Sequence, residues 1–221
     1  MAKPGPKPKR DNVEWSPRVA YGVGLFTTDG CLSIDGRHLD FTSKDIEQLE
    51  NFKKCFDLDT KISYKTSGFT DKKYPRLQFS DVGLYRFFES IGLEPAKTKT
   101  IGVIDIPKKY YFHFLRGHLD GDGCFYSYWD KRWKSSFMFY LTFSAYSEPH
   151  IVWIRKALKD RLGVSGHLSK PSKKRIFELK YAKKESMKIL EKMYHDKDVI
   201  CLSRKRLKIE KALGIMGKQL P

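Results

Sequence analysis

The sequence has few features of a membrane-spanning, secreted or zinc-binding protein. It contains no uninterrupted run of about 18 apolar residues, so no transmembrane helix is predicted. No apolar segment follows the basic N-terminus, so we expect no secretory signal. Four cysteines, at positions 31, 55, 124 and 201, form no CxxC pair and meet no histidine cluster at zinc-ligand spacing. We therefore expect reduced thiols in an intracellular protein that has no membrane partner.

Acidic residues are scarce relative to basic ones. The 221 residues include 43 Lys and Arg against 26 Asp and Glu, a formal net charge of +17. This excess repels itself in a compact chain, and a polyanion such as DNA or RNA relieves the repulsion. With 40% hydrophobic residues the chain can still bury a core. The composition favours a globular nucleic-acid-binding protein, although ribosomal and membrane-surface proteins share the excess.

The chain contains an internal repeat with an offset of 93 residues. Residues 24–31 (GLFTTDGC) match residues 117–124 (GHLDGDGC) at Gly, Asp, Gly and Cys. A polar strand-like stretch, a helical pattern, alternating strand-like runs and a closing helix follow each copy. The runs lie at 61–65 and 76–80, with a weaker counterpart at 175–181, and the closing helices near 81–91 and 183–194. The helical patterns are Ile46, Leu49, Phe52 and Phe56 in one copy and Ile151, Ile154, Leu158 and Leu162 in the other.

This order predicts an α+β fold of two pseudo-symmetric αββαββα repeats with antiparallel hairpins. The first repeat spans residues 16–104, with a linker to about 109 that Pro95 and Pro107 interrupt, and the second spans 107–221. Residues 1–15 form a basic arm that we expect to be flexible, either a minor-groove ligand or a solubilising tail. A duplicated chain folds like a two-fold dimer joined by a linker, so we expect a monomer.

Each repeated motif is typical of a helix end. Ser16 is a suitable N-cap, and the first helix continues to Asp29-Gly30, where Gly30 suits a position of positive φ. The second helix is predicted to begin near Pro107 or Lys108 and to end at Asp122-Gly123. Glycine inside a helix costs about 0.5–1 kcal/mol relative to alanine. Each helix has two small residues four positions apart, Gly24 with Thr28 and Gly117 with Gly121. These pairs indicate that the two helices pack closely.

Asp29 and Asp122 end these two helices. An acid at a helix C-terminus is disfavoured by about 0.3–1 kcal/mol, and packing the helices together adds repulsion between the carboxylates. A cation between them removes both problems, and oxygen ligands of this kind favour Mg²⁺. A carboxylate-bound metal against a phosphate is the usual arrangement for phosphodiester cleavage. One Asp-Gly pair is ordinary turn chemistry, but two at equal offset predict a paired metal site.

The motifs resemble the LAGLIDADG family. Residues 115–123 (LRGHLDGDG) match its signature at Leu, Gly, Asp, Asp and Gly, and residues 22–30 (GVGLFTTDG) keep Gly, Leu, the final Asp and the final Gly. The resemblance covers about residues 16–210. It implies a saddle of antiparallel sheets around two central motif helices. It also implies a homing endonuclease that cuts both strands of a long, asymmetric DNA target, leaves short 3′ overhangs and is commonly encoded in an intron or intein; we do not expect this chain to be an intein.

The resemblance implies a set of site residues. Asp29 and Asp122 would be catalytic metal ligands, helped by backbone carbonyls of Thr28 and Gly121. The metal would be Mg²⁺, with Mn²⁺ as a substitute and Ca²⁺ supporting binding without cleavage. Basic residues would polarise attacking water and steady phosphoryl charge. These are Lys97 or its rival Lys99 in one half, and Lys205 or its rival Arg204 in the other, where a solvated basic helix start is the alternative for Lys205. The corresponding water-positioning residues would be Asp40 and Ser144.

Polar residues on the strands are expected to face a DNA groove, where Arg and Gln read base edges and most lysines contact phosphates. Double-stranded DNA is thus the expected partner, and no protein partner is required. An RNA maturase or a non-cleaving DNA-binding regulator on the same scaffold is the alternative. The candidate contacts are Arg37, His38, Lys61, Ser63, Lys65, Lys72, Lys73, Arg76 and Gln78 in the first copy, and Tyr126, Tyr128, Lys131, Arg132, Lys134, Lys170, Lys173, Lys174 and Arg175 in the second.

Overall fold

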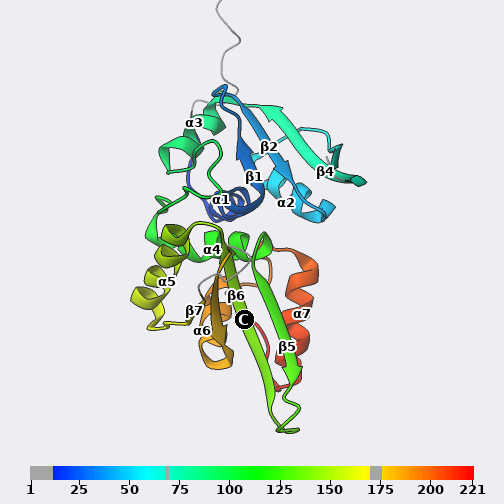
Figure 1. Ribbon diagram of the computed structural model, residues 1–221, viewed down its shortest axis with the longest axis vertical. Coiled ribbons are helices and arrows are strands. Elements are labelled where there is room, and N and C mark those ends of the chain that lie inside the picture. Colours follow the sequence, from blue (N-terminus) through cyan, green and yellow to red (C-terminus); the bar gives the residue numbers. More distant parts are fainter. Residues whose placement is uncertain (1–11, 68–69, 170–175) are drawn as a thin grey trace, which may run out of the picture.

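The computed structural model describes residues 12–67, 70–169 and 176–221 (Figure 1). Most of the predicted basic arm and four predicted DNA contacts, Lys170, Lys173, Lys174 and Arg175, lie outside the described residues. No helix of the described part is long and apolar enough to cross a membrane.

Two αββαββα units form the chain, as the repeat predicts. The first consists of α1 (Pro17–Asp29), β1 (Gly30–Leu32), β2 (His38–Thr42), α2 (Ile46–Phe56), β3 (Ser63–Ser67), β4 (Thr70–Ser80) and α3 (Val82–Ser90). The second consists of the 3-10 turn η1 (Lys108–Tyr110), α4 (Tyr111–Asp120), β5 (Cys124–Trp129), β6 (Phe137–Ala145), α5 (Glu148–Leu162), β7 (His167–Ser169), β8 (Phe177–Ala182) and α6 (Lys183–Met193), with a further helix, α7 (Ser203–Gly214), after it.

Each unit contains one antiparallel four-stranded sheet. The strand orders are β1-β2-β4-β3 and β5-β6-β8-β7, so the two sheets have the same topology. Phe41 pairs with Leu77 in the first sheet and, 102 positions later in the chain, Phe143 pairs with Leu179. The offset grows from 93 in the motifs to 102 here because the β5–β6 hairpin is nine residues longer. That hairpin projects from one end of the molecule in Figure 1.

Helices α1 and α4 pack against each other at the centre of the molecule, between the two units (Figure 1). The side-chain oxygen of Ser16 accepts a hydrogen bond from the Val19 amide and caps α1, as predicted. Gly24 and Gly117 lie at the contact. A Cβ on Gly24 would lie 2.1 Å from the Phe114 carbonyl oxygen, and one on Gly117 would lie 2.1 Å from that of Tyr21. Glycine is needed here because only backbone without a side chain fits.

Several details of the motif helices differ from the predictions. Gly30 has φ −91°, so it is not in the left-handed region. Glycine is required there for space, because a Cβ would lie 2.2 Å from the Phe26 ring. The second helix begins as a 3-10 turn and its α-helical part ends at Asp120, two residues before Asp122. Ile46 was expected to face the core but is 50% exposed at the start of α2.

Candidate metal centre and nucleic-acid surface

The tips of α1 and α4 bring Asp29 and Asp122 together. A Cβ on Gly121 would lie 1.9 Å from the Thr28 hydroxyl and 2.9 Å from Asp29 Oδ2, so the two chain segments touch at this point. Burial, and then the charge of Asp122, raise the pKa of Asp29 to about 6. Burial also raises the pKa of Asp122. Both carboxyls therefore resist ionisation in the metal-free protein, Asp122 because of desolvation and Asp29 because of desolvation combined with like charge.

Two buried lysines lie beside the acids. The Lys97 ammonium donates to the Gly30 carbonyl oxygen, and burial lowers its pKa to about 8. The Lys205 ammonium lies 2.6–3.0 Å from the carbonyl oxygens of Leu119, Asp120, Gly121 and Gly123. It thus places positive charge on the otherwise unpaired carbonyls at the end of α4.

The rival basic residues point elsewhere. Lys99 is exposed on the loop that buries Lys97. Arg204 makes two hydrogen bonds to the Asp45 carboxylate, at 2.6 and 2.9 Å. Of each predicted pair, the structure therefore brings only Lys97 and Lys205 to the acids. Lys205 is only 9% exposed, so it is not a solvated basic residue at the start of a helix, which was the alternative.

The donor set suits a hard divalent cation. The described residues contain no group of three or more His, Cys, Asp or Glu side chains arranged to hold a metal. Side-chain ligation here is thus limited to the two aspartates. Mg²⁺ commonly binds through one or two carboxylates and completes its shell with water and substrate phosphate oxygens. The carbonyl of Gly121, a predicted ligand, also accepts a hydrogen bond from Lys205 at 3.0 Å. The pair of acids therefore fits Mg²⁺ and does not form a closed site.

Gln48 contacts one of the acids, although no motif in the sequence indicates it. Its Nε2 donates to Asp29 Oδ2 at 2.8 Å, and its Oε1 accepts from the Ser43 hydroxyl at 3.0 Å. Gln48 is 3% exposed and lies in the first turn of α2. The amide is therefore held in one orientation, with its N–H directed at the carboxylate.

The equivalent position in the second unit is occupied by a histidine. Adding the sheet offset of 102 to Gln48 gives His150, on α5. The His150 Nδ1 lies 2.8 Å from the Gly102 carbonyl oxygen, and its ring stacks on His118 at 5.3 Å between centroids. Burial lowers the pKa of His150 to about 4 and also lowers that of His118 well below its usual value, so both rings are neutral. The His150 Nε2 and His118 Nδ1 are buried and have no hydrogen-bond partner among the residues that the structure describes.

Both histidines line a small cavity next to the second acid. The same cavity, which has a volume of about 40 Å³, is also lined by Asp122, Ser144 and Lys97. Ordered water needs roughly 10–15 Å³ and two or more polar partners, so the cavity can hold it. The repeat is the one sequence signal that relates Gln48 to His150. The offset of 93 between the motifs does not relate them, because the two sheets are offset by 102.

The strand register corrects one expectation about the water-positioning residues. Asp40 pairs with Gln78 and Ser144 pairs with Glu178, so the sheet equivalent of Asp40 is Thr142 and not Ser144. The Asp40 carboxylate lies 3.2 Å from the Arg76 guanidinium and 3.7 Å from the Lys65 ammonium. Ser144 lines the cavity at Asp122, whereas the polar contacts of Asp40 run along its own sheet.

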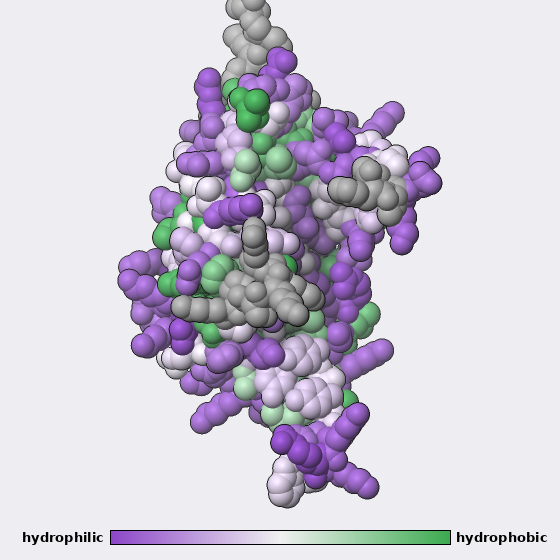
Figure 2. Space-filling view, viewed as in Figure 1, coloured by the Kyte–Doolittle hydropathy of each residue, from purple (hydrophilic) through white to green (hydrophobic). Residues whose placement is uncertain are grey.

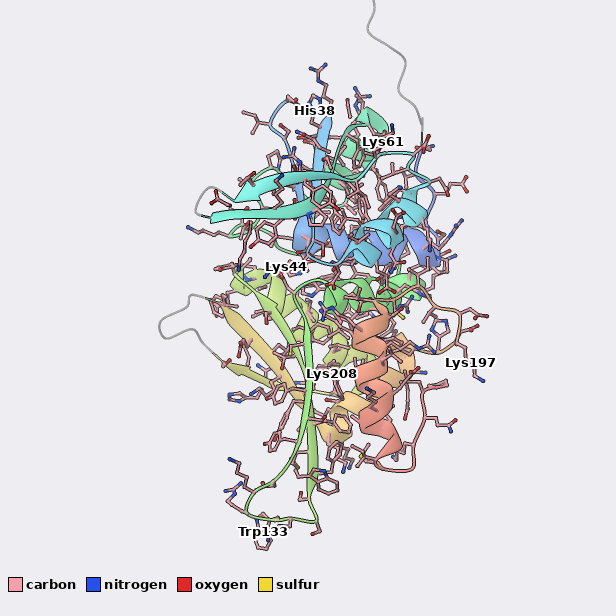
Figure 3. All side chains as sticks on the ribbon, turned by 90° about the vertical axis from the view of Figure 1, so that its right-hand side faces the viewer. His38, Lys44, Lys61, Trp133, Lys197 and Lys208 are labelled. Atoms are coloured by element: carbon pink, nitrogen blue, oxygen red, sulfur yellow. The ribbon has the colours of Figure 1, made fainter. Side chains whose placement is uncertain are left out.

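The predicted DNA contacts of the first unit gather on and beside one sheet face. Ser63, Lys65, Arg76 and Gln78 share the face of Asp40 by strand register and ion pairing. His38 lies at the outer end of β2, and Figure 3 shows it at the opposite end of the molecule from Trp133 of the β5–β6 hairpin. The exposed residues Lys72 and Lys73 continue along β4, and Arg37 and His38 both contact Asp35.

The predicted contacts of the second unit lie on the projecting hairpin. Tyr126 and Tyr128 are on β5, and Lys131, Arg132 and Lys134 are in the connection to β6, where Figure 3 labels Trp133 at the tip. Arg132 forms hydrogen bonds with the Asp130 carboxylate on the same loop. The two sets of candidate contacts therefore occupy different sheets, on either side of the central helices.

Comparisons with known proteins identify the fold. The structure matches the homing endonuclease I-LtrWI bound to target DNA, with 14% identity, a TM-score of 0.60 and coverage of 91% of this chain and 90% of that one. It matches the meganuclease I-SmaMI bound to uncleavable DNA at 15% identity and a TM-score of 0.62, with coverage of 94% and 92%. The N-terminal LAGLIDADG domain of DUF199/WhiA matches at 18% identity and a TM-score of 0.53, with coverage of 81% and 82%. No family model and no curated protein sequence matches the chain.

The fold and the position of the paired acids define a two-unit α+β protein with its centre at abutting helix tips. This is the LAGLIDADG homing-endonuclease fold, with both units in one chain.

Proposed function

We propose that this chain is a single-chain, site-specific DNA endonuclease. It would use a divalent metal, Mg²⁺ in the first place, to hydrolyse one phosphodiester bond in each strand of a long asymmetric target and leave short 3′ overhangs. The observation that carries the proposal is the pair of acids, Asp29 and Asp122, at touching helix tips, where the pKa of each carboxyl is raised. Two repelling carboxylates destabilise the metal-free fold, and a cation-dependent function explains why they are there.

The chain's own residues have distinct roles in this proposal. Asp29 and Asp122 hold the metal, with carbonyl oxygens of Thr28 and Gly121 as further ligands. Bound Mg²⁺ would supply Lewis-acid polarisation of a phosphodiester oxygen. Lys97 and Lys205 place two ammonium groups beside the acids, where positive charge favours the additional negative charge of the phosphoryl transition state. The lowered pKa of Lys97, about 8, also lets it exchange a proton near neutral pH.

The surface around the centre supports duplex DNA as the substrate. The chain has a formal net charge of +17, which favours binding to a polyanion. Exposed strands with Arg, Lys, Gln and Tyr side chains lie in sheets on both sides of the acids (Figure 1). A sheet face of this kind can enter a major groove. Intron homing is the biological process that such an enzyme would serve, with Mn²⁺ replacing Mg²⁺ and Ca²⁺ supporting binding alone.

Removing either acid tests the proposal. Asp29→Asn and Asp122→Asn should each abolish double-strand cleavage of a target selected from a randomised plasmid library, because the neutral amide binds Mg²⁺ poorly. Binding of that target, measured by fluorescence anisotropy with Ca²⁺, should stay within a few-fold of the unaltered protein. Asp59→Asn, at an exposed loop residue, is the matched control and should cut normally. Double-strand cutting at the unaltered rate by either centre variant would reject the assignment.

A non-cleaving regulator or an RNA maturase is the second candidate. The match to DUF199/WhiA favours keeping it, because a LAGLIDADG domain alone does not establish cleavage. The selected target separates the candidates. A regulator would bind it tightly and leave both strands intact with Mg²⁺ or Mn²⁺, and a maturase would bind structured RNA in preference to the duplex.

A further inference from the structure

Three tyrosines form a continuous row on the outward face of β5 and β6. The ring centroids of Tyr126 and Tyr140 are 5.2 Å apart, and Tyr128 lies 6.5 and 6.2 Å from them, with all three rings nearly parallel. The Lys180 ammonium lies 5.6 Å from the first two rings. Figure 2 shows pale, weakly hydrophilic side chains gathered over these strands. This aromatic surface remains in contact with water, since Tyr128 is 44% exposed.

The same positions of the first sheet carry different chemistry. The repeat offsets place Ser33 and His38 where the second unit has Tyr126 and Tyr140, and Tyr128 has no counterpart in the first sheet because the β1–β2 hairpin is nine residues shorter. Around them the first sheet carries an Arg–Asp–Lys cluster, in which Asp40 pairs with Arg76 and Lys65. The two faces therefore present different groups to a duplex, one charged and the other aromatic.

Only one apolar group is available in the major groove of DNA, the C5-methyl of thymine. A charged face forms hydrogen bonds with guanine and adenine edges, but an aromatic row has most to gain from covering methyl groups. We propose that the Tyr126–Tyr128–Tyr140 row reads thymine methyl groups, so that the half of the target under the second sheet is specified by thymines and the half under the first sheet is not. This inference rests on the proposed DNA-binding function and adds the chemistry that distinguishes the two half-sites.

Uracil substitution tests the inference one methyl at a time. Replacing thymine with uracil removes the C5-methyl and keeps every hydrogen-bonding group of the base pair. In the half of the selected target that the second sheet covers, uracil substitution should weaken binding about fourfold for each contacted methyl, as expected from the transfer free energy of one buried carbon. The same substitution in the other half should leave binding within about twofold. Binding is measured by anisotropy with Ca²⁺, so cleavage is not required.

Variants assign the effect to the tyrosine row. Tyr128→Ser should weaken binding of the thymine target and remove most of the penalty for uracil in the sensitive half. Tyr64→Ser changes a tyrosine that is 58% exposed on the opposite face of the first sheet, and it should leave the penalty unchanged. Each comparison uses one folded protein with two DNAs, so a change in stability does not mimic the result.

Three outcomes would overturn the inference. The first is equal binding of thymine and uracil targets in both halves by the unaltered protein. The second is a uracil penalty that Tyr128→Ser leaves intact. The third is tighter, Tyr128-dependent binding of single-stranded DNA or RNA than of the duplex, which would mean that the row stacks on unpaired bases. If no specific duplex is bound at all, the proposed function itself has failed.

Discussion

At the scale of single residues, the two halves of the centre are chemically unequal. Gln48 offers an amide N–H to Asp29, whereas its equivalent, His150, presents a neutral imidazole whose Nε2 has no partner in the described part of the chain. Because the Nδ1 donates to the Gly102 carbonyl, the Nε2 is a hydrogen-bond acceptor. An acceptor at this cavity orients water differently from an amide donor. The two strands of the target should therefore be nicked at different rates.

Exchanging these side chains tests that inequality. We expect Gln48→His and His150→Gln to change the ratio of the two nicking rates in opposite directions, each by several-fold, because each variant alters the contacts of one half only. The ratio is measured in supercoiled or end-labelled DNA, with the two strands labelled separately. Loss of overall stability would slow both strands together and leave the ratio unchanged. An unchanged ratio in both variants contradicts the inequality.

The raised pKa of Asp29 predicts a pH-dependent stability of the metal-free protein. The pKa is about 6 in the folded chain and 3.8 in the reference state. The folded state thus holds this proton more tightly, and the resulting stability is present below pH about 4 and is lost as the pH rises through 6. Asp29→Asn should match the unaltered protein near pH 4 and exceed it by roughly 1–3 kcal/mol at pH 8. Urea unfolding with EDTA measures this difference, and equal stability at pH 8 would contradict it.

Asp120, which is fully buried, also contributes to the pH dependence of stability. Burial raises the pKa of Asp120 to about 6, although Tyr21 and the Leu202 amide donate to its carboxylate. Asp120 is retained in the Asp29→Asn variant, so the stability of that variant should still decrease to some extent as the pH rises. Added Mg²⁺ should reverse the order of stability at pH 8, because the unaltered protein alone has both ligands.

The site residues that belong to the repeated motif were predictable from the sequence. The motif gives Asp29 and Asp122 directly, and the glycines beside them follow from the same match. The choice between Lys97 and Lys99 depends on which side chain is buried, and two lysines two positions apart cannot be distinguished by pattern alone. Gln48 and His150 were missed because polar residues at the start of a helix normally face solvent.

At the scale of elements, the contact between α1 and α4 depends on two glycines. Gly24→Ala or Gly117→Ala would place a methyl group 2.1 Å from a backbone carbonyl of the other helix, so the helices must separate. Overpacking of this kind costs about 1–3 kcal/mol or more, and the displaced helix tips should also lower cleavage. Chemical denaturation and nicking assays measure the two effects.

The control for this prediction is a glycine with free space. Gly214→Ala places its methyl group where, among the described residues, nothing beyond its own helix and chain neighbours lies within 4 Å, so its stability and activity should stay close to those of the unaltered protein. If all three variants behaved alike, the close approach of the helices would not be required.

Most elements were predictable because apolar periodicity and the repeat agree. Alternation located β4, and three- and four-residue spacing located α2 and α5. The final helix, α7, was not predicted as a separate element because the first unit has no counterpart for it. Its sequence is strongly basic, and its buried side is evident only from packing, where Ile209, Ala212 and Leu213 join the core.

At the scale of the whole molecule, both units and both acids are in one chain. We therefore expect a monomer in solution, because a second copy would add nothing to the centre. Light scattering at micromolar concentration should give the mass of one chain, with and without DNA. A stable dimer would contradict this expectation. Binding should also weaken steeply as salt increases, in keeping with the net charge.

The cation at Lys205 is delivered by the last helix of the fold, although the carbonyl oxygens it neutralises end a helix more than eighty residues earlier. A growing polypeptide that has already made both aspartates and both sheets still lacks this ammonium group. In the proposed endonuclease, competence to cut would therefore be acquired only once α7 has been made and packed, and a chain truncated before it would have an unfinished centre.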